Sequence, residues 1–186
     1  IALMKLHSPA FDENQQIPVL FIREGGNISP PLQWDSVPAG TESLALIMED
    51  PDAPSGVFTH WLLYNLPDSM RGLDREVPQG DHYGAHAFQG INDFGSHGYD
   101  GPQPPEGEHR YIFKLYALDG RVPLESGADK ATLLQAMDGH ILAEADLTGL
   151  YNKKSRDDIE REMEKAEKED YNRRHKQLER FWLKFM

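Results

Sequence analysis

Short apolar runs separated by frequent proline and glycine dominate the first 150 residues of this chain. Proline and glycine interrupt regular helices, and apolar runs of roughly four to eight residues between such interruptions are typical of β-strands. The pattern predicts a mainly antiparallel β-sandwich with few helices. The expected strands cover residues 17–22, 43–49, 57–66, 111–118 and 140–147.

One helix and one long loop are expected inside this β part. Asp129 can cap the helix, the residues after it are good helix formers, and Gly139 can end it. Glycine and proline are too frequent in residues 84–107 for regular structure, so this segment is predicted to be a loop. Long ordered loops are more often functional than structural.

The character of the chain changes after Asn152. Residues 153–186 contain no glycine or proline and are highly charged, and Ser155 can cap a helix that runs to Met186. We therefore expect a β domain over residues 1–152 and a charged helical extension over residues 153–186.

The end of this extension carries an apolar face. Its residues follow the i, i+3, i+4, i+7 spacing of one side of a helix, and each would forgo roughly 1.5–3 kcal/mol if left in water. The charged stretch before them, about 35 Å long as a helix, would carry them away from their own sandwich. This geometry favours self-association in a homo-oligomer over packing along the same domain. The predicted assembly residues are Leu178, Phe181, Trp182 and Phe185.

The charge of the chain is unevenly placed. Residues 1–152 contain 8 basic and 22 acidic residues, a net charge of −14, whereas residues 153–186 have a net charge of +2. Nucleic-acid binding draws on Lys and Arg, so the acidic body argues against it. An anion site in such a body has to be built locally, from histidines and backbone N–H groups. Because no apolar run approaches about 18 residues, no membrane span is expected.

Cysteine is absent, which excludes disulfides and thiolate metal sites. Met4 leads directly into the first strongly patterned block, residues 8–11, so we expect Met4 to be the natural start. That start leaves no room for a signal peptide and favours a cytoplasmic location. A leader removed ahead of Ile1 is the alternative.

Two segments carry the residues best suited to bind a small ligand. Residues 50–54 (Asp-Pro-Asp-Ala-Pro) precede His60, and a Pro-rich loop at residues 101–108 precedes His109. Each lies beside an expected strand, so Asp50 and the two histidines can meet at one site. Taken singly, an aspartate in a turn or a histidine within an apolar strand is more often structural.

The same segments resemble the phosphatidylethanolamine-binding proteins, in particular the bacterial and archaeal branch often called Raf kinase inhibitor-like. The resemblance is colinear over residues 4–151, including residues 27–32 (Asn-Ile-Ser-Pro-Pro-Leu), and does not reach residues 153–186. It implies a β-sandwich with an anion pocket, no metal or other cofactor, and no enzymatic activity. Relatives in this branch often have cysteine where Arg23 and Gln103 stand here.

The resemblance assigns Asp50, His60 and His109 to the pocket, and the residue types agree with a phosphate or phosphoryl headgroup as ligand. Imidazole N–H groups donate to phosphoryl oxygens, and Tyr111 can add a phenolic donor. Arg110 alternates with its neighbours along the strand, so we expect it on the opposite face in a structural ion pair. The remaining candidates are Pro104 and Pro105 as an apolar wall, with Asp52, Pro54, Asn92 and Asp93 as loop support.

The sequence leaves three functions open. The first is a non-enzymatic anion-binding protein, which the resemblance extends to a regulatory role as an inhibitor of a kinase or protease. The second is a metal-dependent enzyme, because two histidines and one carboxylate can ligate iron or zinc. The third is an assembly protein that acts through its C-terminal helix.

Overall fold

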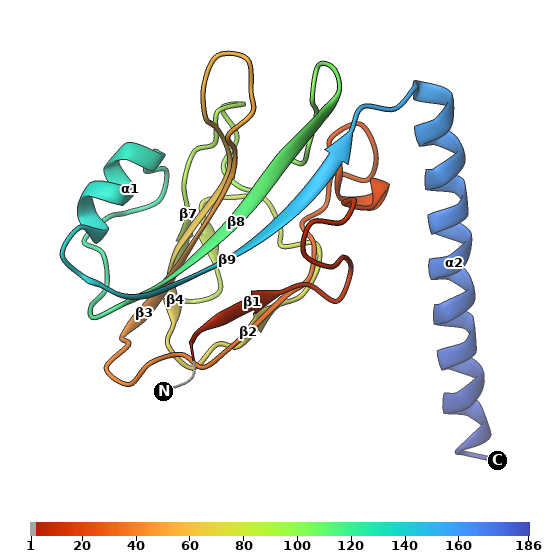
Figure 1. Ribbon diagram of the computed structural model, residues 1–186. Coiled ribbons are helices and arrows are strands. Elements are labelled where there is room, and N and C mark those ends of the chain that lie inside the picture. Colours follow the sequence, from red (N-terminus) through yellow and green to blue (C-terminus); the bar gives the residue numbers. More distant parts are fainter. Residues whose placement is uncertain (1–2) are drawn as a thin grey trace.

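The structure is a computed structural model that describes residues 3–186. Ile1 and Ala2, which precede the expected start at Met4, lie outside the described residues. Two antiparallel sheets and two α-helices make up the fold (Figure 1). The larger sheet has the order β6 (His82–Tyr83), β7 (Ala87–Gln89), β4 (Phe58–Pro67), β3 (Ser43–Asp50), β8 (Glu108–Leu118) and β9 (Ile141–Asn152). The smaller has the order β1 (Lys5–His7), β2 (Leu32–Asp35) and β5 (Gly72–Leu73).

The main core lies between the two sheets. Leu6 and Trp34 from the smaller sheet pack in one buried cluster with Trp61 and Phe113 from the larger one. The predicted sandwich is therefore confirmed. All eight residues of β3 are buried, because this central strand has the core on one face and a second apolar cluster on the other. A strand covered on both faces reads as a continuous apolar run, which is why its position was clear from the sequence.

The second cluster lies under α1 (Lys130–Met137), which covers the outer face of the larger sheet (Figure 1). The Asp129 side chain accepts a hydrogen bond from the backbone N–H of Thr132 at 2.8 Å, as predicted for its cap. Gly139 follows the helix with φ of +79°, a conformation that favours glycine. The expected helix is confirmed, together with four of the five expected strands.

Two local expectations are wrong. Residues 17–22 do not form a strand but a turn of 3₁₀-helix, η1 (Val19–Phe21), that follows Pro18. Pro18 has no N–H to donate to a sheet, and the apolar character of the segment reflects the burial of Ile17, Val19 and Phe21 in the core. The predicted loop over residues 84–107 also contains a strand, β7, which pairs with β4.

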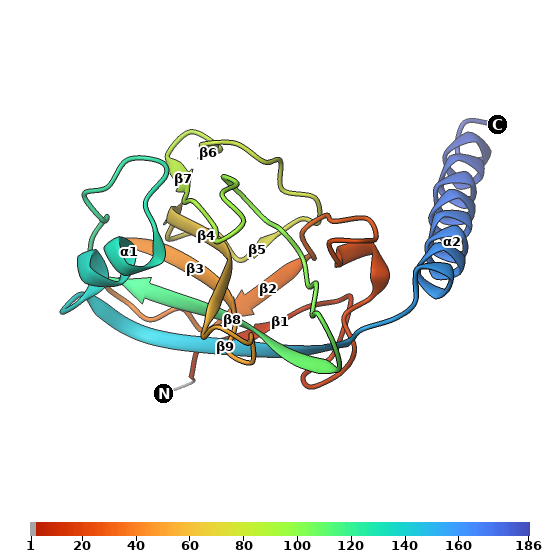
Figure 2. The ribbon, with the colours of Figure 1, turned by 90° about the horizontal axis from the view of Figure 1, so that it is seen from above.

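The long helix α2 (Arg156–Leu183) stands beside the sandwich, and its C-terminal end points away from it (Figures 1 and 2). Ser155 accepts a hydrogen bond from the backbone N–H of Asp158 at 3.1 Å, which confirms the predicted cap. Ile159 is buried in the main core and Asp170 pairs with Arg75 at 2.9 Å, so the N-terminal half of α2 is the attached half. Within residues 3–186, no helix is both long enough and apolar enough to cross a bilayer.

Candidate functional site

Three neighbouring strands bring the four predicted ligand-binding residues together at one end of the larger sheet. Asp50 ends β3, His60 lies in β4, and His109 and Tyr111 lie in β8, with β3 between the other two strands. All four are buried, with at most 7% of each residue exposed. The rings of His60 and Tyr111 meet edge to face with centroids 5.3 Å apart. We call these four residues the histidine cluster.

Asp50 fixes the orientation of His109. The Nδ1 atom of His109 donates to Oδ2 of Asp50 at 2.7 Å, while Oδ1 of Asp50 accepts from the backbone N–H of Asp52 at 2.8 Å. The carboxylate is thus fixed by its own loop and in turn fixes the imidazole. The Nε2 atom of His109 makes no hydrogen bond to any other residue in 3–186 and remains available to a ligand.

Asp52 lies on the other side of this loop. Its carboxylate accepts two hydrogen bonds from the Arg110 guanidinium, at 2.9 and 3.0 Å, and one from the Arg110 backbone N–H. These contacts lower the pKa of Asp52 to about 2. The ion pair predicted for Arg110 is present, and it ties the loop after β3 to the start of β8.

His60 has a defined tautomer. Its Nδ1 atom lies 2.7 Å from the backbone carbonyl oxygen of Asp100, which can only accept, so Nδ1 carries the proton. Burial lowers the pKa of His60 and favours the neutral ring. In that form Nε2 is an acceptor, and it makes no hydrogen bond within the residues described.

The Tyr111 hydroxyl is buried and makes no hydrogen bond of acceptable geometry within residues 3–186, although the Asp50 carboxylate and the Gln103 backbone lie near it. Burial, followed by the negative charge of Asp50, raises the pKa of Tyr111, so the phenol keeps its proton. A buried hydroxyl without a partner costs about 1–3 kcal/mol. Its place beside His60 and His109 marks a position where a ligand would satisfy it.

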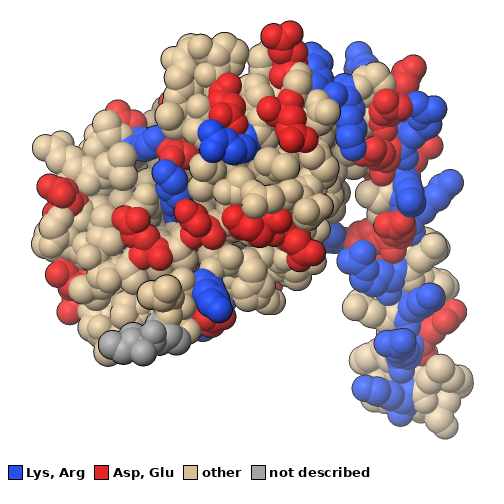
Figure 3. Space-filling view, in the orientation of Figure 1, with Lys and Arg blue, Asp and Glu red and all other residues tan. Residues whose placement is uncertain are grey.

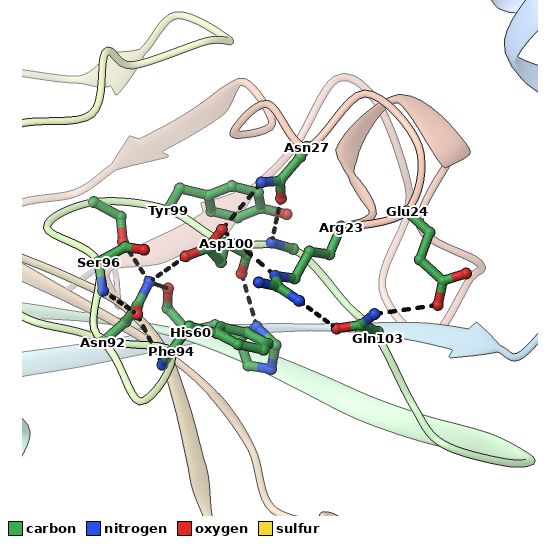
Figure 4. A network of polar contacts seen from close by, with 12 residues as sticks. Arg23, Glu24, Asn27, His60, Asn92, Phe94, Ser96, Tyr99, Asp100 and Gln103 are labelled. Atoms are coloured by element: carbon green, nitrogen blue, oxygen red, sulfur yellow. Dashed lines mark hydrogen bonds and ion pairs between the residues drawn. The ribbon is translucent and has the colours of Figure 1, made fainter.

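A network of amide and carboxylate side chains holds His60, one member of the histidine cluster, from one side (Figure 4). The carboxylate of Asp100 accepts from Asn27 at 3.0 Å and from Asn92 at 2.8 Å, so Asp100 is fixed and can present its carbonyl to His60. The Oδ1 atom of Asn92 accepts from the backbone N–H groups of Phe94 and Ser96, which closes the loop over residues 92–96.

The other predicted supporting residues occupy different places. Asp93 accepts from the backbone N–H of Thr59 at 2.7 Å, next to His60. Pro104 is buried, as a wall residue would be, whereas Pro54 and Pro105 are exposed. Of the two prolines predicted as a wall, only Pro104 has the burial that a wall requires.

Asp100, Asn27 and Arg23 belong to this region and were missed by motif reasoning. Asn27 has a positive φ of 51°, an asparagine-tolerated conformation that its place in a Gly-Gly-Asn turn could have signalled. For Asp100 the signal was weaker, because an aspartate in a Gly- and Pro-rich loop looks like an ordinary turn residue. Nothing in the local sequence of Arg23 indicates its neighbours.

Metal ligation was the chemistry of the alternative enzyme. Within residues 3–186, no group of three or more His, Asp or Glu side chains is arranged to hold a metal ion. Asp50 directs its carboxylate to Nδ1 of His109, and His60 directs its own Nδ1 to a backbone carbonyl. The absence of a metal in the protein stays a prediction.

The fold is a two-sheet antiparallel β-sandwich with two histidines, an aspartate and a tyrosine buried together at one end of the larger sheet. Residues 7–152 match the family described as phosphatidylethanolamine-binding protein, and this chain belongs to that family. The resemblance inferred from the motifs is confirmed. Residues 153–186 lie outside the matched segment.

Relatives and solved structures agree with this assignment. The chain is 51% identical to a UPF0098 protein of Methanothermobacter thermautotrophicus over 150 residues, which cover 81% of this chain and 99% of the relative. It is 43% identical to a UPF0098 protein of Aquifex aeolicus over 155 residues, which cover 82% and 90%. A crystal structure of a phosphatidylethanolamine-binding protein homologue from Chlamydia trachomatis aligns with a TM-score of 0.73 and 43% identity, covering 82% and 99%. The crystal structure of Escherichia coli YbcL aligns with a TM-score of 0.75 and 32% sequence identity. The alignment covers 82% of this chain and 100% of YbcL.

Proposed function

We propose that the protein binds a small tetrahedral anion, phosphate or a phosphoryl headgroup, at the histidine cluster, without catalysing a reaction. The observation that carries this proposal is the buried Tyr111 hydroxyl, which has no partner among residues 3–186 and lies beside two imidazoles with free Nε2 atoms. The hydroxyl donates at all relevant pH values. Each imidazole donates from Nε2 once it is protonated, or accepts from a protonated phosphate oxygen when neutral.

Phosphate titration followed by NMR tests the proposal. The ring signals of His60 and His109 should shift with one common dissociation constant, and His109→Ala should weaken binding by about 1.5–3 kcal/mol. His140→Ala is the matched control, because His140 is an exposed histidine that likewise contacts an aspartate, Asp119, at 2.8 Å. Unmoved His60 and His109 signals at saturating phosphate would rule the function out.

Regulation of a kinase or protease is the biological output that the family resemblance implies, and it stays part of this proposal. A protein partner would contact the surface around the site, since the cluster itself is buried. Inhibition assays with and without saturating phosphate would show whether the two activities are linked. The cytoplasmic location stays a prediction, tested by fractionation of cells that express the native gene.

The metal-dependent enzyme stays the alternative to anion binding. Metal analysis of protein purified without nickel resin decides between them: we expect well under one equivalent of zinc or iron. Stoichiometric metal that is lost in a His60→Ala, His109→Ala double variant would favour the enzyme.

A second candidate function is self-association through α2. Leu178, Phe181, Trp182 and Phe185 are 54–72% exposed, so the sandwich does not cover the apolar face that the sequence predicted. Residues 171–186 carry five basic and one acidic residue, and Figure 3 shows this basic end projecting from the body. The charge of −14 over residues 1–152 makes the sandwich of a second copy the complementary partner.

Light scattering tests this second function. The full chain should form a dimer or larger assembly with rising concentration, and a Phe181→Ser, Trp182→Ser variant should stay monomeric. Asn172→Ser is the control, since this exposed residue lies on the same helix outside the apolar face. A monomer at all concentrations, or a monomer that binds vesicles containing phosphatidylserine, would overturn self-association.

A further inference from the structure

The charge balance of the histidine cluster raises a question about its ligand. Burial lowers the pKa of His60 and favours its neutral form, and any charge on the His109 imidazole is matched by the carboxylate of Asp50 that it contacts. While both rings are neutral, each Nδ1–H is already donated and each Nε2 is an acceptor, so the cluster offers a ligand the Tyr111 hydroxyl as a donor and no net positive charge. In a body with a net charge of −14, a doubly charged anion needs one further cation close by.

Arg23 is placed to be that cation. Its guanidinium carbon lies 4.0 Å from the centroid of the Phe94 ring, and the same ring meets His60 edge to face at 5.6 Å. Asp100 joins the two residues a second time, because its carbonyl accepts from His60 while its Oδ1 atom lies 3.8 Å from Nε of Arg23. Figure 4 shows Arg23 between Asp100 and Gln103.

The contacts of Arg23 orient its guanidinium but leave one of its nitrogen atoms without a hydrogen bond. Its Nη1 atom donates to Oε1 of Gln103 at 2.7 Å, and at 3.8 Å its contact with Asp100 is an ion pair without a hydrogen bond. Asp100 is already satisfied by the amides of Asn27 and Asn92. The Nη2 atom of Arg23 makes no hydrogen bond to any other residue in 3–186, and 39% of the side chain is exposed.

The other basic side chains of the β part with assigned contacts are engaged elsewhere. Arg110 pairs with Asp52 on the opposite side of the loop, and Arg75 pairs with Asp170 of α2. The remaining ones contact Glu49 (Lys114 and Lys130) or backbone carbonyls (Arg71 and Arg121). Arg23 is thus the basic residue of this group that is stacked on a ring in contact with the histidine cluster.

We propose that Arg23 makes this site selective for a phosphomonoester dianion over a singly charged phosphodiester. The inference rests on the proposed anion binding at the histidine cluster and names its ligand class. A monoester presents three terminal oxygens, enough to accept from the Tyr111 hydroxyl, a protonated histidine and the planar guanidinium together. A diester has two terminal oxygens and one charge less, so it gains less from Arg23.

Calorimetric titration with methyl phosphate and dimethyl phosphate at about pH 7 tests the selectivity, because a monoester, whose second pKa is about 6, is mostly a dianion there and a histidine can still take up a proton on binding. The native chain should prefer methyl phosphate. Arg23→Gln should weaken methyl phosphate binding roughly 10- to 100-fold, the usual loss for a hydrogen bond to a charged group, and dimethyl phosphate binding by less than about threefold. Arg23→Lys, which keeps the charge but loses the planar fork, should fall between.

Arg121→Gln is the matched control, because Arg121 also donates one hydrogen bond to a neighbour, the His86 carbonyl, away from the site. It should bind both ligands like the native chain. Equal losses for the two ligands in Arg23→Gln, or no loss, would overturn the role of Arg23 and leave anion binding intact. A native chain that binds neither ligand would overturn both proposals. Melting curves of each variant check that it is folded.

Discussion

The Nδ1 atom of His60 donates a hydrogen bond to the backbone carbonyl of Asp100 at 2.7 Å, which fixes both the tautomer and the direction of the imidazole. Asp100 is itself held by Asn27 and Asn92, from two separate loops. His60 is therefore oriented by residues that are distant from it in sequence. Since burial favours the neutral ring, both the stability of the fold and its affinity for anions should depend on the protonation of His60.

The free energy of unfolding should fall as the pH drops below 6.5. The pKa of His60 is lowered in the folded state from 6.5, so the unfolded chain takes up the proton first. Stability is complete above 6.5 and declines until the lower, folded-state pKa is passed, by about 1.4 kcal/mol for each unit between the two values. Urea denaturation between pH 5 and 8 should show that the free energy of unfolding depends less on pH in His60→Gln than in the native chain. The exposed-site control His86→Gln should keep the pH dependence of the native chain.

Sulfate should bind more tightly as the pH falls, although the stability of the free protein declines. Sulfate itself does not titrate near neutrality, so any dependence comes from the protein. A bound anion favours the charged imidazole and raises the pKa of His60, so binding takes up a proton between the free and the bound pKa values. Calorimetry at pH 5.5 and 7.5 should show this difference, and it should be reduced in His60→Gln. Identical affinities at both pH values would contradict the coupling.

Tyr111→Phe and Tyr99→Phe should have opposite effects. The Tyr111 hydroxyl has no partner within residues 3–186, so its removal should leave the melting temperature unchanged or higher while phosphate binding weakens. The Tyr99 hydroxyl donates to the Phe21 carbonyl at 2.6 Å in the core, so its removal should lower stability by roughly 0.5–1.5 kcal/mol or more and spare binding. A destabilised Tyr111→Phe with normal binding would mean that the Tyr111 hydroxyl is structural.

The central strands and both helices could be predicted because their signals are local. The apolar run of β3, the Asp129 cap and the Ser155 cap each lie within a few residues of the structure that they specify. The segment with Val19 and Phe21 could not be assigned correctly, because burial in a 3₁₀ turn gives the same apolar pattern as burial in a strand.

The residues of the histidine cluster could be predicted from their motifs, whereas the residues that surround the cluster could not. Asp50 and His109 stand in specific segments of the sequence, but the contact between their side chains joins positions 59 residues apart. The links from Asp100 to Asn27 and from Arg23 to Gln103 span 73 and 80 residues and depend on how two loops pack. Such contacts follow from tertiary structure and leave no periodic trace in one sequence.

The side chains of Arg23 and Gln103, the two positions at which the family resemblance implies cysteine in relatives, are in contact at 2.7 Å. The backbones are also close: the Arg23 N–H donates to the Pro102 carbonyl at 3.0 Å. A Cβ at neighbouring Gly101 would lie 2.0 Å from the Phe21 carbonyl oxygen, so this close approach requires glycine. We expect Arg23→Cys, Gln103→Cys to form a disulfide, visible as a mass loss of about 2 Da relative to the reduced form.

The cross-link should stabilise the fold, because it closes a loop of roughly 80 residues and restricts the unfolded chain. The loop-entropy relation gives an upper value of about 4.5 kcal/mol. A higher melting temperature that is lost on reduction would agree, and either single cysteine variant serves as the control. If the pair stays reduced under oxidising conditions, the two loops are not held as close as their contacts indicate.

The two halves of α2 should differ in hydrogen exchange. Ile159 is buried and Asp170 is held by Arg75, whereas the side chains from Tyr171 to the C-terminus are all exposed. Helical segments of fewer than about 12–15 residues are marginal in water, so the C-terminal half relies on the attached half for its helix. In dilute solution, amide groups of residues 160–170 should therefore be better protected than those of residues 175–183.

Hydrogen exchange measured at rising protein concentration also tests self-association through α2. If the exposed aromatic end docks on a second copy, residues 175–183 should gain protection with concentration, and Phe181→Ser, Trp182→Ser should abolish the gain. Ile159→Ala should instead lower protection in the N-terminal half, because it removes the side chain that anchors α2 in the core. Protection of residues 175–183 that is already high in dilute monomer would contradict a free helix end, and would place its apolar face against the protein's own sandwich.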